Sequence, residues 1–316
     1  MNSSFIDAAS AGRNTWPRYL SAVLLMIFGI AVINIGTVLG SALTIQWLDN
    51  DLDFDTALNA ATSYLAVSWA WDTPYTAQDF IIFSYFLGSI GLSGLAVLAV
   101  VKTVHKRPIG SLIAPSGKFR WRLFWRSFLA GLIAGIIASS ALWAGASGQV
   151  SVNADLGAVG MLVAAILILA PLQVFAEEVM FRGYILQSVA HYSHRTAVRL
   201  FVPSILFFAI HLGYEGEKTD AYIYAAYYFG IAFYLTWIAI KTDGLESSFG
   251  LHLAVNLIAF VLISDSSRPF LTPTIFYLPD AQTILLPFEL TLLVGLHYWW
   301  SVRPIVNSTS IKKIGQ

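Results

Sequence analysis

The 316-residue sequence contains no cysteine. This absence excludes disulfide bridges, thiolate metal sites and a cysteine nucleophile. Charged residues are scarce as well, at 11% of the chain, against roughly 25% in soluble domains. The 18 basic and 18 acidic residues balance, so the chain lacks the basic footprint of a nucleic-acid-binding protein and we expect no nucleic-acid partner. Neither an internal repeat nor a low-complexity segment is visible, which gives no support to repeat-built transporter folds.

Apolar residues are abundant: 57% of the chain is hydrophobic, and its mean hydropathy is +0.69. The first uncharged run is far longer than the roughly 7–15 apolar residues of a signal peptide, so we expect a retained spanning helix. The sequence therefore predicts an all-α, polytopic membrane bundle of about eight transmembrane helices. The predicted spans are Tyr19–Leu48, Phe80–Val101, Ser127–Ala154, Leu156–Ala176, Thr196–Gly213, Ala221–Ile240, Ser247–Ser264 and Ala281–Val302.

Loop charges predict the orientation of these spans. Asp49–Asp79 carries six aspartates and no Lys or Arg, whereas Lys102–Arg126 carries seven basic residues and no acid. Because cytoplasmic loops are enriched in Lys and Arg, we place both termini in the cytoplasm, which leaves 16 of the 18 basic residues on that side. We expect an integral, multi-pass protein of the plasma (inner) membrane. Within the acidic loop, Ala57–Trp71 is predicted to form an interfacial helix.

Three charged residues interrupt the fourth apolar run, at Glu177, Glu178 and Arg182. A charged side chain at the centre of a bilayer costs at least ~2.5–3.5 kcal/mol, so each needs a partner, water or a function. On a helix, Glu178 and Arg182 are four residues apart and share one face, which predicts an ion pair. Glu177 is rotated by about 100° from Glu178, and this leaves it available for chemistry.

Polar side chains also enter three later spans. His211 lies late in the fifth span, His252 and Asn256 are four residues apart in the seventh, and Glu289 stands alone in the eighth. If the fourth helix continues to about Ala190, the rise per residue places the first three near the depth of the glutamates, in the cytoplasmic half of the bilayer. We interpret Glu289 as a structural acid, protonated or bonded to water.

Three motifs occur in order along the chain: E-E-x-x-x-R at Glu177–Arg182, F-x-x-x-H at Phe207–His211 and H-x-x-x-N at His252–Asn256. Together they resemble the CPBP family of intramembrane endopeptidases, which is related to CAAX prenyl proteases and bacteriocin-immunity proteins. The resemblance covers residues 156–264, the predicted catalytic core of spans four to seven. Residues 1–155 then form an N-terminal three-span region, and residues 265–316 form the last span and a cytoplasmic tail.

The resemblance implies a role for each motif residue. Glu177 would be the general base on a water that His211 also holds, and His252 with Asn256 would form an oxyanion site. Glu178 and Arg182 would support the helix. The implied substrate is a membrane-associated peptide or protein, unmodified or lipid-modified, cleaved in contact with the lipid bilayer.

Alternatives remain at this point. His and carboxylate groups also suit zinc, so Glu177, His211 and His252 are an alternative zinc site. Adjacent glutamates cannot both face one ion cleanly and no H-E-x-x-H motif is present, so we expect a metal-free mechanism without a cofactor. A non-catalytic membrane scaffold or immunity protein that retains the motif is the second functional hypothesis. A proton-coupled transporter ranks third, because the motif residues cluster in one half of the bilayer.

Overall fold

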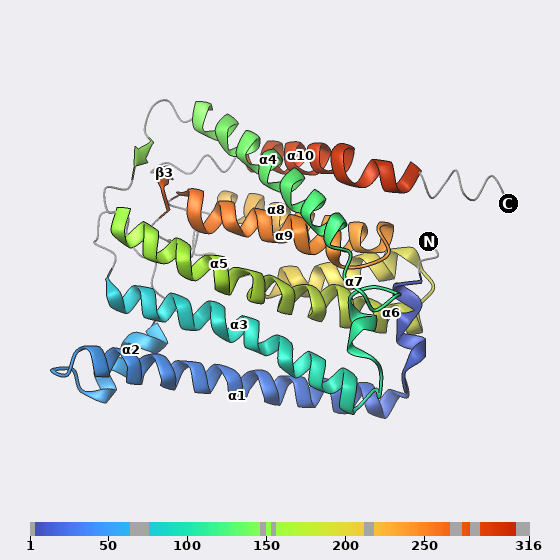
Figure 1. The fold of residues 1–316 in the computed structure, drawn as a ribbon, viewed down its shortest axis with the longest axis horizontal. Helices are drawn as coiled ribbons and strands as arrows, with labels where there is room; N and C mark the ends of the chain where they lie inside the picture. Colours follow the sequence, from blue (N-terminus) through green and yellow to red (C-terminus); the bar gives the residue numbers. More distant parts are fainter. Residues whose placement is uncertain are drawn as a thin grey trace.

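The computed structural model describes residues 4–63, 76–145, 150–152, 156–211, 218–265, 274–278 and 285–307. Most of these residues are helical, and the helices lie side by side with roughly parallel axes (Figure 1). The α-helices are α1 (Trp16–Leu48), α2 (Phe54–Ser63), α3 (Ala77–Thr103), α4 (Trp121–Gly145), α5 (Leu156–Glu178), α6 (Leu186–Tyr192), α7 (Thr196–Ala209), α8 (Lys218–Lys241), α9 (Glu246–Leu257) and α10 (Leu286–His297). π-Helical segments follow α5, α9 and α10 at Val179–Ile185, Ile258–Leu262 and Tyr298–Val302.

Packing follows a simple order across the bundle. α1 packs on α3, α3 on α5, α5 on α9, and α9 on α4, while α10 contacts both α4 and α8 (Figure 1). α5 and α9, which carry most of the predicted site residues, therefore lie in the interior of the bundle. The predicted all-α fold class is confirmed.

Among the described residues, five helices are long and apolar enough to cross a membrane, which makes this an integral multi-pass membrane protein. They are Trp16–Leu48, Ala77–Thr103, Trp121–Ala141, Val159–Tyr192 and Ala221–Lys241. α7 and the α9 segment Glu246–Leu262 are apolar but shorter. The count of eight spans stays a prediction.

Several predicted boundaries change in the structure. α4 begins at Trp121 rather than Ser127 and its described part ends at Gly145, so two arginines lie on its first turns. The fourth span remains helical past the charged stretch to Tyr192, as the depth argument required. The interfacial helix appears as α2, over Phe54–Ser63, and the rest of the predicted range to Trp71 lies outside the described residues.

A small sheet joins three connections and was not predicted. Its strands are β1 (Ser151–Val152), β3 (Phe276–Leu278) and β2 (Ile263–Asp265), in that spatial order. β1 pairs with β3 in antiparallel fashion, and β2 pairs with β3 in parallel. Strands of two or three residues are too short to show the period-two alternation that identifies a strand in sequence.

The N-terminal segment packs against the end of the bundle where Figure 1 marks the N-terminus. Phe5 is fully buried, and its backbone N–H donates a hydrogen bond to Asp243 in the turn before α9, at 2.8 Å. His105, just beyond α3, contacts the Arg13 carbonyl at 3.1 Å, and burial lowers the pKa of this imidazole. The N-terminus, the basic loop after α3 and the turn before α9 thus share one end, as the loop charges predict.

Close glycine contacts set the positions of α5 and α9. A Cβ atom on Gly250 of α9 would lie 2.5 Å from the Phe124 carbonyl oxygen of α4. A Cβ atom on Gly94 of α3 would lie 2.9 Å from the Cβ of Ala176, the residue before Glu177. Only glycine permits these approaches without a backbone shift, because side chains would otherwise hold the helix axes further apart.

Topology can be measured directly because the chain has no native cysteine. Asn59 on α2 and Ser116 after α3 are both exposed and lie on loops predicted to face opposite sides of the membrane. We expect Asn59→Cys to react with an impermeant maleimide in intact cells and Ser116→Cys to react only after permeabilisation. Equal labelling of both cysteines in intact cells would contradict the predicted orientation.

Candidate active site

The predicted ion pair lies at the junction of α5 and the π-helical segment. Arg182 Nη1 donates to Glu178 Oε1 at 2.9 Å, and both side chains are fully buried. Arg182 Nη2 donates to the Ala232 carbonyl of α8 at 3.3 Å, and its guanidinium lies 4.2 Å from the Phe207 ring centroid. The arginine therefore ties the fourth span to both α7 and α8.

His252 of α9 shares the same glutamate oxygen. Its Nδ1 lies 2.9 Å from Glu178 Oε1, and because a carboxylate that pairs with an arginine accepts hydrogen bonds, Nδ1 carries the proton. The other ring nitrogen, Nε2, lies 3.5 Å from Glu177 Oε2. Glu178 thus orients His252 as well as binding Arg182, a contact that the i, i+4 spacing along one helix could not reveal.

Glu177 is buried at the centre of this arrangement, with 8% of its side chain exposed. Within the described residues, its Oε2 atom, Glu178 Oε2 and Arg182 Nε are buried without a hydrogen-bond partner. Such atoms are uncommon in proteins because leaving a buried polar group unpaired costs about 1–3 kcal/mol. All three belong to residues of this cluster, which therefore has hydrogen-bonding capacity left for a water or a substrate amide.

The helix widens where the charged residues lie. The π-helical segment Val179–Ile185 begins directly after Glu178 and includes Arg182. π-Helical turns are rare and are often found at functional sites. Phe181 and Arg182 are adjacent in sequence, yet both contact Phe207: the two phenyl rings meet edge to face at 5.1 Å. No residue pattern in the sequence indicated this turn.

His211 reaches the cluster through Phe207. Its Nδ1 lies 2.7 Å from the Phe207 carbonyl, and since a carbonyl can only accept, Nδ1 carries the proton and Nε2 of the neutral ring is an acceptor. The ring centroid of His211 lies 5.3 Å from that of Tyr228 and 4.5 Å from that of Phe207, and the Phe207 ring in turn contacts His252 at 5.7 Å. In the described chain His211 makes no direct hydrogen bond to Glu177.

Asn256 pairs with a residue that was not predicted. Its Nδ2 donates to Oε1 of Gln173 at 2.9 Å, and Gln173 is buried on α5, one turn before Glu177. Two successive contacts thus link α5 to α9. In one, Glu177 and Glu178 meet His252, and in the other, Gln173 meets Asn256. The sequence could have pointed to Gln173, because it precedes the candidate base Glu177 by four residues and so shares its helix face.

The three residues of the alternative zinc site, Glu177, His211 and His252, are not gathered into one group in the described part of the chain, and the metal-free mechanism stays a prediction. Among the described residues, no three His, Cys, Asp or Glu side chains gather closely enough to hold a metal ion. Glu177 and His252 are neighbours, but Glu178 is engaged by Arg182 and His211 lies beyond Phe207. Glu289 is buried on α10, and its structural role stays a prediction.

A second buried polar cluster supports the start of α9. His297 Nε2 of α10 lies 2.5 Å from Ser127 Oγ of α4, and Tyr234 of α8 donates to His297 Nδ1 at 2.9 Å. Ser127 donates to the Ser247 carbonyl of α9 at 2.7 Å. A neutral Nε2–H imidazole satisfies every one of these bonds. This junction joins four helices five residues before His252 and was not predicted, because His297 belongs to no motif.

The chain is similar in sequence to known proteins. The chain is 25% identical over 175 residues to the "Uncharacterized protein YyaK" of Bacillus subtilis (strain 168), an alignment that covers 55% of this chain and 58% of that protein. No solved structure matches. The family model described as type II CAAX prenyl endopeptidase Rce1-like matches residues 159–258, a range that includes all three motifs. Over that range the chain is similar to the type II CAAX prenyl endopeptidases of the Rce1-like model, which confirms the family resemblance of the motifs.

Proposed function

We propose that this protein is an intramembrane endopeptidase that hydrolyses a peptide bond with a water activated by Glu177. The observation that carries the proposal is the set of buried contacts across α5 and α9, in which His252 lies between Glu178 and Glu177. The Rce1-like match over residues 159–258 supports the same reaction class.

Glu177 is suited to act as the general base. Its carboxylate has no arginine partner, unlike Glu178, so it can take a proton from water without breaking an ion pair to an arginine. The resulting hydroxide adds to the scissile carbonyl carbon and gives a tetrahedral oxyanion. Collapse breaks the C–N bond, and the proton held by Glu177 passes to the leaving amine, which balances the reaction. The Nε2 acceptor of His211 is the second group proposed to hold the water.

His252 and Asn256 are the proposed oxyanion donors. One N–H of the Asn256 amide binds Gln173, and the amide carries a second N–H that can point to the oxyanion. His252 Nε2 can donate only as an imidazolium, and with Nδ1 bound to Glu178 the ring is already oriented for that role. A positioned donor of this kind contributes on the order of 3 kcal/mol to transition-state stabilisation.

The proposed substrate is a membrane-associated peptide or protein segment, cleaved in the cytoplasmic half of the bilayer. The family model is described by its prenyl endopeptidase activity, so a prenylated C-terminal segment is the first substrate to test. Because the alignment spans 58% of the curated relative, the activity and the substrate of the whole chain are both part of the proposal.

Comparison of membrane proteomes tests the function and searches for the substrate together. Cells that carry the wild-type protein should contain shortened forms of at least one membrane protein, and cells with Glu177→Ala should accumulate the full-length form. Both proteins must be present at equal levels. Identical peptide termini in both samples, across prenylated and unmodified proteins alike, would favour the scaffold hypothesis instead.

The metal-free mechanism makes a separate prediction. Glu178 is paired with Arg182 whereas Glu177 has no arginine partner, and no three-ligand group forms among the described residues. We therefore expect the purified protein to keep its peptidase activity in excess chelator. Metal analysis of the same sample should give well under one zinc ion per chain. Activity that is lost on chelation and returns specifically with zinc would establish the metalloprotease alternative.

A further inference from the structure

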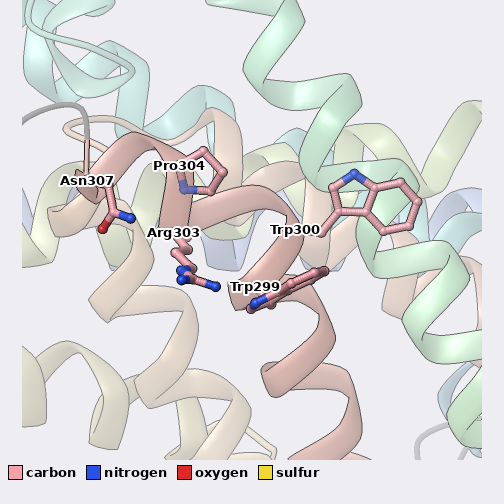
Figure 2. Close-up of a pocket in the computed structure, with 5 residues that line it drawn as sticks. All are labelled: Trp299, Trp300, Arg303, Pro304 and Asn307. Carbon is pink, nitrogen blue, oxygen red and sulfur yellow. The ribbon is translucent and has the colours of Figure 1, made fainter.

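An open pocket lies at the end of α10, away from the candidate active site. It has a volume of about 610 Å³, and its lining residues are Trp299, Trp300, Arg303, Pro304 and Asn307 (Figure 2). The two indoles are 66% and 51% exposed. Trp299 and Arg303 approach each other, with the guanidinium carbon 5.9 Å from the indole ring centroid.

Charge around the pocket is of one sign. Arg303 is exposed, and Arg126 of α4 donates to the Trp300 carbonyl. The sequence contains no Asp or Glu in residues 102–154, which include all of α4, or in residues 290–316, which include the pocket. An anion at the pocket would therefore meet arginines without a competing carboxylate on α4 or on the chain after Glu289 of α10.

The position of the pocket indicates the kind of anion. α10 ends on the same side as the N-terminus (Figure 1), which the loop charges place in the cytoplasm. Exposed tryptophans of membrane helices lie at the level of the lipid headgroups. The cytoplasmic leaflet carries anionic lipids, and basic pockets between helices on that side bind lipid headgroups.

We propose that this Trp–Arg pocket binds the phosphate headgroup of an anionic phospholipid, with Arg303 and Arg126 facing the phosphate and the two indoles packing on the glycerol and upper acyl chains. The pocket holds the lipid beside the α4–α10 contact. Arg126 precedes Ser127, which bonds both His297 of α10 and Ser247 of α9. Lipid bound here therefore stabilises the contacts of α4 and α10 with α9, the helix that carries His252. Its binding is expected to raise the unfolding temperature of the protein.

The test uses the full chain, purified in detergent and stripped of lipid. Phosphatidylglycerol and phosphatidylcholine are titrated separately, with bound lipid counted by native mass spectrometry and thermal unfolding followed in parallel. We expect the anionic lipid to bind more tightly and to raise the unfolding midpoint. Arg303→Gln should weaken phosphatidylglycerol binding by about fivefold, the effect of one basic residue at the membrane surface. Arg303→Lys should keep most of the binding.

Arg122→Gln is the matched control, because Arg122 is an exposed arginine on the first turn of α4 that does not line the pocket. It should change binding little. Equal losses in the two glutamine variants would show attraction to the general surface charge and overturn the pocket. Equal affinity for the two lipids would overturn it as well. So would a rise in the unfolding midpoint with inorganic phosphate alone that equals the rise with phosphatidylglycerol. Unaltered melting of lipid-free Arg303→Gln establishes that the variant is folded.

Discussion

Replacing Glu177 with glutamine is expected to lower peptide hydrolysis by about 10²-fold or more while the fold stays intact. Glutamine has nearly the same shape but cannot take a proton from water at neutral pH. The carboxylate it replaces has no arginine partner and lies 3.5 Å from His252 Nε2, so the change removes a base without breaking a short ion pair. Turnover of a cleavable reporter peptide measures the loss, and thermal unfolding in detergent measures the fold.

Glu177→Asp provides the matched control for this experiment. It keeps the carboxylate but withdraws it by one methylene, so we expect activity between that of the wild type and that of Glu177→Gln. A stable Glu177→Gln protein that hydrolyses the reporter at the parental rate would rule out Glu177 as the base. The scaffold hypothesis would then explain the buried cluster better.

Replacing Glu178 with glutamine is expected to destabilise the fold strongly. Both partners of the Glu178–Arg182 pair are fully buried, so the variant leaves the guanidinium without its paired carboxylate among helices α5, α7 and α8. Loss of one partner of a buried pair costs about 3–5 kcal/mol. The same glutamate oxygen accepts from His252, so activity should fall in the fraction that remains folded.

Two further variants test whether the loss of stability comes from the unpaired Arg182 charge. Glu246→Gln also breaks a buried glutamate's ion pair, but its partner Arg120 is 39% exposed and can turn to water. We expect a smaller loss of stability there, because exposed charges are less costly to leave unpaired. The double variant Glu178→Gln, Arg182→Met should recover part of the lost stability, since it removes the stranded charge. A Glu178→Gln protein that unfolds at the wild-type temperature would contradict the pair's structural role.

Much of this protein could be predicted from its residues alone. Long uncharged runs can be stable only in lipid or in a core, so composition determined the membrane class before any contact was known. The Glu178–Arg182 pair depends only on the geometry of a single helix, and the structure contains it. The order of the three motifs along the chain indicated the family resemblance, which the match over residues 159–258 bears out.

Contacts between helices were decided only by the tertiary structure. Whether Glu178 also meets His252, and whether Gln173 meets Asn256, depends on the rotation and separation of α5 and α9. Close packing of α9 on α4 at Gly250 and of α3 on α5 at Gly94 helps to place the two helices, and no spacing along one helix encodes these contacts. The π-helical turn after Glu178 redirects the next side chains in the same way. Sequence spacing determines which residues share a face of one helix, whereas the packing of neighbouring helices determines what that face meets.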